Sequence, residues 1–388
     1  MMNKQLLDDL KTQFAHHFGV EPTVVAYAPG RVEVLGNHTD YNEGYVLSAA
    51  IDSGTYFACA PSTDAECRLV AQNLGEECRF GLANVTASKA MSWANYVKGV
   101  LSGLQARATI TSGFKGMFVG NIPMGAGLSS SAALEMSAGL ALAKLYGVTV
   151  PALDMAKIGQ AAEHRFAGVK CGLLDQISSL FGQENALVMS DFRSLEVRTV
   201  PLGGDACFLI CNTSVKHALV ESEYNERRER CEQAAHFFAS VLKHPVTHLR
   251  DVSWDELEQH RSAMDPVVAK RATHVIGENT RVLKGRELLR GHDLESFGKL
   301  MFESHESSRT QFENSCPELD VIVDAARALP EALGARLSGG GFGGSVVVLV
   351  RAGDAVPVAA ALARAYNQAF GHPCATMTIK PAMGAGII

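Results

Sequence analysis

The spacing of hydrophobic residues predicts helices and strands along most of the chain. Between Leu6 and Phe18 they fall three and four residues apart and Gly19 follows as a stop signal, which indicates an amphipathic helix. Alternating and β-branched residues predict a strand over 23–34, interrupted at Pro29-Gly30. Similar patterns predict strands at 117–119, 207–211, 345–350 and 376–380, and helices at 131–146, 153–166, 221–242, 281–290, 293–306, 320–329 and 356–370.

The order of these elements bears on the fold class. They do not alternate as regular strand–helix–strand units, so the pattern favours an α+β fold over a doubly wound sheet. A chain of 388 residues is long for one compact core and comfortable for two. The run Pro201-Leu202-Gly203-Gly204 is a natural joint. We therefore expect an N-terminal domain at 1–200 and a C-terminal domain at 201–388.

Composition narrows the class of protein. Hydrophobic residues make up 47% of the chain and charged residues 20%, which excludes a disordered chain. A net charge of -6 argues against nucleic-acid binding as the main function. No apolar run approaches the roughly 18 residues of a membrane span, and the N-terminus lacks the apolar core of a signal peptide. Nine cysteines without a CxxC pair predict reduced thiols. We expect a cytoplasmic protein that binds neither nucleic acid nor membranes.

A segment rich in glycine and serine stands between a predicted strand and a predicted helix. It comprises Gly125, Ala126, Gly127, Leu128, Ser129, Ser130 and Ser131. Glycines let a backbone approach a ligand closely, and a helix N-terminus attracts phosphate. The segment lacks the Gly-Lys-Ser/Thr of a Walker loop and the Gly-x-Ser-x-Gly of a nucleophile elbow. It predicts either a phosphate-binding loop or a simple serine N-cap after a glycine turn.

A second glycine-rich run occupies residues 339–344. It matches the dinucleotide fingerprint G-x-G-x-x-G, but a strand follows it where that fingerprint needs a helix. This context argues against a dehydrogenase. The run predicts a loop that approaches a ligand or another backbone closely, with a structural tight turn as the alternative.

A third segment, at residues 29–42, crowds polar side chains just after the first predicted strand. Sugar hydroxyls need such a cluster, because each hydroxyl both donates and accepts in a fixed direction. A solvated turn has a similar composition, so the segment alone is only suggestive.

Together these segments resemble the galactokinase branch of the GHMP small-molecule kinases. The motif Gly30-Arg31-Val32, Gly36 and His38-Thr39-Asp40-Tyr41-Asn42 is similar to the galactokinase signature, and the two glycine-rich runs are similar to the general kinase signatures. Residues 162–164, 171–176 and 222–228 agree as well. The resemblance covers nearly the whole chain. It implies a two-domain α+β GHMP-kinase fold, with the active site in the cleft between the domains.

The resemblance also implies an activity and a set of roles. The reaction would transfer phosphate from Mg-ATP to the anomeric hydroxyl of α-D-galactose, in galactose catabolism. The matching catalytic residues are Asp175, as the base, and Arg31, which would stabilise charge on the transferring group. Residues 125–131 would wrap the ATP phosphates. The Mg²⁺ ligands would be Ser131 and Glu163, and the sugar-binding residues Asn37, His38, Thr39, Asp40 and Tyr224. We expect a monomer or a weak dimer.

Each of these residues also has an ordinary structural explanation. Asp175 just before a helix is compatible with an N-cap. Arg31 at a strand edge is compatible with a solvated charge, and Glu163 with an exposed helix face. Their occurrence together, in family order, favours the functional interpretation.

The sugar motif departs from the family pattern at two positions. The family has Asn where this chain has Glu33 and Glu where it has Asn37, and that Glu helps to bind the C6 hydroxyl. If the two side chains touch each other and the sugar, the exchange preserves one carboxylate and one amide. Otherwise, loss of the carboxylate admits galacturonate, because two like charges about 4 Å apart repel by roughly 4 kcal/mol near a protein surface. We favour compensation, and hence galactose.

Other functions remain as alternatives. The pocket alone limits the choice between galactose and a modified sugar such as galacturonate or N-acetylgalactosamine. A protein that senses galactose and ATP and regulates transcription without turnover is a further alternative. Such relatives can lack residues of the serine loop. Here the loop, Arg31 and Asp175 are all present, which favours catalysis.

Overall fold

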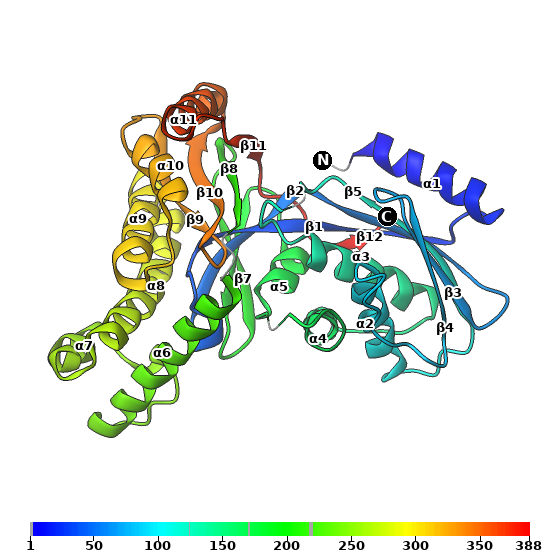
Figure 1. Cartoon of the computed structure of the whole chain (residues 1–388), viewed down its shortest axis with the longest axis horizontal. Coiled ribbons are helices and arrows are strands. Elements are labelled where there is room, and N and C mark those ends of the chain that lie inside the picture. The colour runs from blue at the N-terminus through cyan, green and yellow to red at the C-terminus, as the bar shows by residue number, and fades with distance from the viewer. Residues whose placement is uncertain (1–2, 124, 170, 217–219) are drawn as a thin grey trace.

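The computed structural model describes residues 3–123, 125–169, 171–216 and 220–388. Two sheets organise this part of the chain (Figure 1). The larger sheet has the strand order β12-β1-β2-β5-β3-β4, and β6 and β7 extend it beside β2. Its strands are β1 (Val24–Leu35), β2 (Tyr45–Pro61), β3 (Glu66–Ala71), β4 (Glu76–Gly81), β5 (Phe114–Gly120), β6 (Ala186–Asp191), β7 (Glu196–Pro201) and β12 (Gly386–Ile387).

Strand β1 runs without a break where the sequence predicts an interruption. It pairs antiparallel with β2 along its whole length, and the register shifts only between Pro29 and Arg31 and between Glu33 and Leu35. A proline is tolerated at such an irregularity because its missing N–H is not needed there. The strand therefore continues, with a local shift that lies directly beside Arg31.

Helices cover both faces of the larger sheet (Figure 1). Helix α1 (Lys4–Phe18) packs on one face, where Phe14 contacts a cluster that includes Tyr56 of β2. The opposite face carries helices α2 (Ala94–Gln105), α3 (Ser130–Leu145), α4 (Ala152–Ala162) and α5 (Leu174–Phe181). This layer places the N-termini of α3 and α5 next to β1.

The smaller sheet has the order β11-β8-β10-β9 and is antiparallel. Its strands are β8 (Ala206–Lys216), β9 (Ala332–Ser338), β10 (Gly343–Arg351) and β11 (Ala375–Ile379). The surrounding helices are α6 (Val220–Val241), α7 (Trp254–His260), α8 (Pro266–Arg290), α9 (Leu294–Ser307), α10 (Pro317–Arg327) and α11 (Ala355–Phe370). One hydrophobic core joins the two sheets, because Val32 and Leu47 of the larger sheet share a cluster with Phe208 and Val347 of the smaller.

Several observed elements differ from the predicted ones for identifiable reasons. The helix predicted at 281–290 is only the end of α8, because buried Arg271, His274 and Glu278 break the hydrophobic pattern of its first half. Strands β2 to β4, β6, β7, β9 and β12 were not predicted. The α+β class is confirmed. The domain boundary predicted between residues 200 and 201 lies at the end of β7 and stays a prediction. Among the described residues, no helix has both the length and the apolar character needed to cross a bilayer.

Candidate active site

A partly buried ion pair joins β1 to the first turn of α5. The Nε and Nη2 atoms of Arg31 lie 2.7 and 2.6 Å from Asp175 Oδ1, and Nη1 donates to Gly127 O at 2.7 Å. Ser129 Oγ donates to the other carboxylate oxygen at 2.5 Å. Leu173 occupies the N-cap position of α5, so Asp175 is not the cap. Arg31 is only 8% exposed, so it is not a solvated surface charge.

The glycine- and serine-rich segment forms a turn that begins α3. Ser129 occupies the N-cap position of α3, as the structural alternative has it, but its backbone is left-handed (φ 56°) and its side chain makes no capping hydrogen bond. The turn lies against β1, because Arg31 N donates to Leu128 O at 3.1 Å. A Cβ on Gly30 would lie 2.4 Å from that same oxygen, which explains why glycine is needed there.

The turn faces the second glycine-rich run across a cavity of about 570 Å³, called the smaller cavity here. Backbone near Gly341 packs closely on Asn314, since a Cβ there would lie 2.2 Å from Asn314 O. Ala126 is buried behind the turn, where its carbonyl accepts a hydrogen bond from Ser345 Oγ at 2.8 Å. The cavity lining includes Arg31, Asp175, Gly125, Gly127, Leu128, Ser129, Ser130, Ser131 and residues 338–344.

Glu163 and Ser131 meet at one side of the turn. Ser131 Oγ donates to Glu163 Oε1 at 2.8 Å. Glu163 begins a π-helical turn (Glu163–Ala167) and is 4% exposed, so it does not lie on an open helix face. Burial, and then the charge of Asp175, raise the pKa of Glu163. A desolvated carboxylate beside a hydroxyl is an oxygen-only pair of ligands that suits a hard cation such as Mg²⁺.

Within the described ranges, no group of three or more His, Cys, Asp or Glu side chains could hold a metal ion. This finding is compatible with Mg²⁺, which is usually bound through one or two carboxylates together with substrate phosphates and waters. Ser131 and Glu163 therefore fit a magnesium ion that a nucleotide brings with it.

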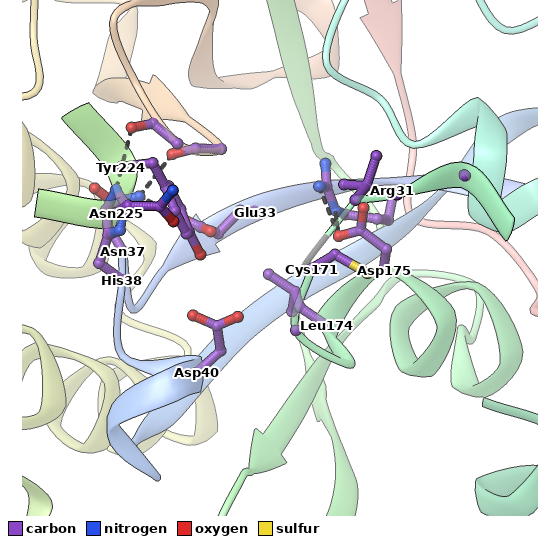
Figure 2. A pocket seen from close by; sticks show the side chains of 16 residues that line it. Arg31, Glu33, Asn37, His38, Asp40, Cys171, Leu174, Asp175, Tyr224 and Asn225 are labelled. Carbon is purple, nitrogen blue, oxygen red and sulfur yellow. Dashed lines mark hydrogen bonds and ion pairs between the residues drawn. The ribbon is translucent and has the colours of Figure 1, made fainter. Parts of the chain in front are cut away.

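A larger cavity, of about 690 Å³, opens on the other side of the ion pair (Figure 2). Arg31 and Asp175 line both cavities, so the two spaces meet at this pair. The remaining lining includes Glu33, Asn37, His38, Asp40, Cys171, Gly172, Leu174, Tyr224, Asn225, Gly339 and Gly340. In Figure 2 the ion pair lies on one side of the space, and Asn37, His38 and Tyr224 lie on the other.

His38 and Asp40 have perturbed acidities in this cavity. Burial lowers the pKa of His38 to about 4, so its ring is neutral at pH 7. His38 Nε2 lies 3.1 Å from Gly340 O, which can only accept, so Nε2 carries the proton and Nδ1 accepts from Tyr41 at 2.8 Å. Burial, and then the charge of Glu33, raise the pKa of Asp40 to about 6. His38 is thus an uncharged hydrogen-bonding group, whereas Asp40 keeps its proton to a higher pH than an ordinary carboxyl.

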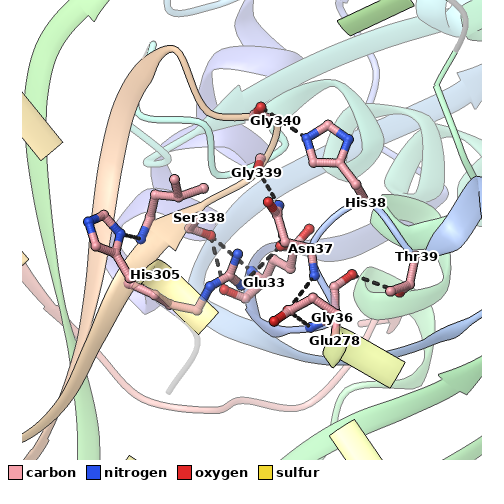
Figure 3. A network of polar contacts seen from close by, with 12 residues as sticks. Glu33, Gly36, Asn37, His38, Thr39, Glu278, His305, Ser338, Gly339 and Gly340 are labelled. Carbon is pink, nitrogen blue, oxygen red and sulfur yellow. Dashed lines mark hydrogen bonds and ion pairs between the residues drawn. The ribbon is translucent and has the colours of Figure 1, made fainter. Parts of the chain in front are cut away.

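Thr39 differs from the other predicted sugar-binding residues in its position. It is fully buried, and its hydroxyl bonds to Gly36 O at 2.8 Å and to Tyr45 O at 2.6 Å, so it does not line the larger cavity (Figure 3). It stabilises the turn that carries His38 and Asp40.

The exchanged residues Glu33 and Asn37 do touch. Asn37 Nδ2 donates to Glu33 Oε1 at 2.9 Å, and buried Arg336 donates to the same oxygen at 3.0 Å. Glu278 Oε2 accepts hydrogen bonds from the backbone N–H groups of Gly36 and Asn37, each at 2.9 Å (Figure 3). Sequence reasoning missed Arg336 and Glu278. The position of Arg336 just before the glycine run was the available signal for the first, whereas only packing reveals the second.

The comparisons with known proteins agree with this geometry. Family models match for the GHMP kinases N terminal domain at residues 95–183 and for the GHMP kinases C terminal domain at residues 286–368. Mevalonate kinase from Methanococcus jannaschii shares the fold, with TM-score 0.61 and 19% identity over 92% of this chain and 98% of that one. Mevalonate kinase from L. major is similar, with TM-score 0.62 and 18% identity over 94% and 98%. The two family matches, together with the shared fold, therefore identify a kinase of the GHMP type.

Two further matches specify the branch. The galactokinase galactose-binding signature matches residues 12–61. Lactococcus lactis galactokinase, solved in complex with galactose, has TM-score 0.91 and 32% identity over 98% of this chain and 99% of that one. The chain belongs to the galactokinase family.

Proposed function

We propose that the protein transfers the terminal phosphate of ATP to the anomeric hydroxyl of α-D-galactose, giving galactose 1-phosphate. One observation carries the proposal: a cavity lined by the polar side chains of Glu33, Asp40 and Tyr224 and a glycine-lined cavity at a helix N-terminus meet at the Arg31–Asp175 pair. Phosphoryl transfer needs mainly positioning and charge neutralisation at such a junction.

Asp175 is proposed to accept the proton of the sugar hydroxyl. Its carboxylate is held by Arg31 and by Ser129 Oγ, which fixes its direction at the point where both cavities open. Arg31 retains its charge throughout, so it stabilises negative charge that develops on the transferring phosphoryl group.

The smaller cavity is proposed to hold ATP, the phosphoryl donor of GHMP kinases. Its backbone N–H groups at the start of α3 and in the glycine run suit phosphate oxygens. Ser131 and Glu163 would hold a Mg²⁺ ion, which when bound supplies positive charge to the phosphates. These two side chains keep an oxygen-only environment at the start of the helix.

The larger cavity is proposed to hold galactose. Asp40 and Tyr224 offer an acceptor and a hydroxyl, and neutral His38 with its fixed tautomer orients the neighbouring Tyr41 and Gly340. The carboxylate of Glu33 stands in this lining and would repel a uronic acid, so the galacturonate alternative is not favoured. The complete pair of cavities likewise favours an enzyme over a non-catalytic sensor.

A panel of sugars tests this function directly. Purified protein is incubated with Mg-ATP and galactose, N-acetylgalactosamine, galacturonate or glucose, and sugar 1-phosphate and ADP are measured together. We expect turnover with galactose to exceed that with each other sugar at least tenfold. ADP release without sugar phosphate, or a preference for another sugar, would reject the proposal.

A further inference from the structure

One carboxylate oxygen of Glu33 is left for a ligand. Oε1 accepts from Asn37 Nδ2 at 2.9 Å and from Arg336 Nη1 at 3.0 Å. In the part of the chain that the structure describes, no group donates to Oε2, although Glu33 lines the larger cavity. An ionised carboxylate has about four acceptor sites, so Oε2 can accept a hydroxyl from a bound sugar.

Arg336 fixes the direction of this carboxylate. Its side chain is completely buried, and its hydrogen bond to Glu33 is part of an ion pair that is shielded from water. The backbone of Glu33 is held as well, since Ser338 Oγ accepts from Glu33 N at 3.2 Å and donates to Glu33 O at 3.1 Å. The acceptor is therefore pre-organised before a sugar arrives.

The amide of Asn37 is occupied by the protein itself. Its two N–H bonds point to Glu33 Oε1 and to Gly339 O, the latter at 2.7 Å. Its oxygen accepts from Asn314 Nδ2 at 3.0 Å. Asn37 therefore has no donor left for a substrate, and it holds the carboxylate of Glu33 in position. The sequence instead predicts Asn37 as a residue that binds the sugar directly.

The position of Glu33 on β1 indicates which hydroxyl it meets. Arg31 and Glu33 are two residues apart in a regular stretch of pairing with β2, opposite Ala50 and Ser48, so their side chains share a face about 7 Å apart. With the anomeric hydroxyl at Arg31 and Asp175, two edges of the sugar ring lead along this strand, one through C2 and C3 and one through the ring oxygen, C5 and C6. The first has a hydroxyl between its ends, so we assign the second. That edge has hydroxyls only at its two ends, which matches two polar side chains with Val32 directed away between them.

We propose that Glu33 is the residue that recognises the C6 hydroxyl in this protein, with Arg336 and Asn37 as its positioning residues. The inference rests on the proposed function, because it takes the anomeric carbon to lie at Asp175. The carboxylate accepts a hydrogen bond from the C6 hydroxyl, and its charge excludes sugars that carry a carboxylate at C6.

Calorimetric binding of galactose and 6-deoxygalactose to wild type and Glu33→Gln tests this proposal. The substitution keeps the size of the side chain but turns an amide group toward the cavity. We expect it to weaken galactose about tenfold, because hydrogen bonds to charged groups are the stronger ones. It should change 6-deoxygalactose less than about twofold, since that sugar has no C6 hydroxyl to lose. Galacturonate should bind the variant at least about tenfold more tightly than wild type.

Glu278→Gln is the matched control. Glu278 is also a buried carboxylate paired with an arginine, as Arg281 Nε lies 2.6 Å from its Oε1, but it is not part of the cavity lining. This variant should change the binding of the two sugars by the same factor. Equal factors for Glu33→Gln as well would overturn the proposal, because they would indicate a purely structural role.

Loss of a charge beside buried Arg336 is a risk to folding, so thermal unfolding of each variant is measured first. If Glu33→Gln does not fold, the exchange variant E33N/N37E keeps one carboxylate next to Arg336. It should still prefer galactose over 6-deoxygalactose, and loss of that preference would contradict the pairing of carboxylate and guanidinium. Wild-type turnover with galactose is recorded separately, so a failure of the proposed reaction is distinguishable from a failure of the C6 assignment.

Discussion

Two hydrogen bonds, one from Arg31 Nε and one from Ser129 Oγ, hold the carboxylate of Asp175, and Arg31 Nη2 adds an ion-pair contact. If this carboxylate takes the proton from the sugar hydroxyl, Asp175→Asn should lower kcat about 1000-fold, because an amide cannot accept a proton at this step. The affinity for galactose should change less than about threefold. Steady-state kinetics and calorimetry measure the two effects separately.

Ser129→Ala is the companion variant, because it removes one partner of the carboxylate and leaves the carboxylate itself. It should lower kcat only about tenfold through poorer orientation. A kcat for Asp175→Asn within tenfold of wild type would contradict the assignment of Asp175 as base.

The raised pKa of Asp40 predicts a conflict between stability and function. The folded protein binds a proton at Asp40 up to about pH 6, whereas the unfolded chain releases it near pH 4. The contribution of Asp40 to the free energy of unfolding is therefore fully present below pH 4. It is lost as the pH rises through 6, because the folded state must then hold a desolvated charge at this residue. Asp40→Asn should raise the apparent Tm of the ligand-free protein at pH 8 by roughly 2 °C, with no gain at pH 4.

The same Asp40→Asn variant should bind galactose at least about tenfold more weakly at pH 8, because it loses a charged acceptor. Scanning fluorimetry at pH 4, 6 and 8 with and without galactose gives both results. An equal gain in Tm at all three pH values would show that the charge is not the cause.

At the scale of elements, the site depends on how closely the start of α3 approaches β1. Leu128 O accepts from Arg31 N at 3.1 Å, and a Cβ on Gly30 would lie 2.4 Å from that backbone oxygen. Gly30→Ala should therefore push the serine turn away from Arg31. We expect the apparent Tm to fall by about 5 °C and kcat/KM to fall at least about tenfold.

Gly204→Ala is the control for this prediction, because a Cβ on Gly204 meets nothing within 4 Å. It should leave both quantities unchanged. A Gly30→Ala variant with wild-type kcat/KM would mean that the turn can retreat without cost to the site.

Some elements of the site could be predicted from sequence because their signals are local. Hydrophobic spacing gave the helix at α3, and glycine and hydroxyl residues marked the turn before it. The short helix α5, which carries Asp175, has eight residues and is too short for a periodic signal. Strand β1 was predicted with a break, because proline and glycine usually end a strand and only pairing with β2 allows it to continue.

At the scale of the whole molecule, residues 386–388 pair with β1, the strand that carries Arg31 and Glu33. Strand β12 pairs with β1 through Ala26 and Tyr27, and Ile388 N donates to Val25 O at 2.9 Å. Deletion of residues 386–388 exposes this edge of β1. The apparent Tm should fall by about 5 °C, because several backbone hydrogen bonds of about 1 kcal/mol each are lost.

Alanine at both Ile387 and Ile388 tests whether the backbone or the side chains matter. These side chains are 47% and 42% exposed, so the double substitution should change the Tm by less than about 1 °C. If it destabilises as much as the deletion, side-chain packing rather than strand pairing holds the C-terminus.

The sequence by itself determined the α+β class and the glycine-rich turns, because these depend on short-range patterns of residue type, which a linear chain displays. The chemistry assigned to Arg31, Asp175, Ser131 and Glu163 follows instead from the resemblance to the kinase family, and it stays a prediction. Only the tertiary structure decided which groups are already occupied. Asn37 bonds to Glu33, Gly339 and Asn314, and Arg336 reaches Glu33 from 303 residues away. A side chain's free donors and acceptors depend on partners brought together by packing, and that packing leaves the carboxylate of Glu33 in the lining of the larger cavity.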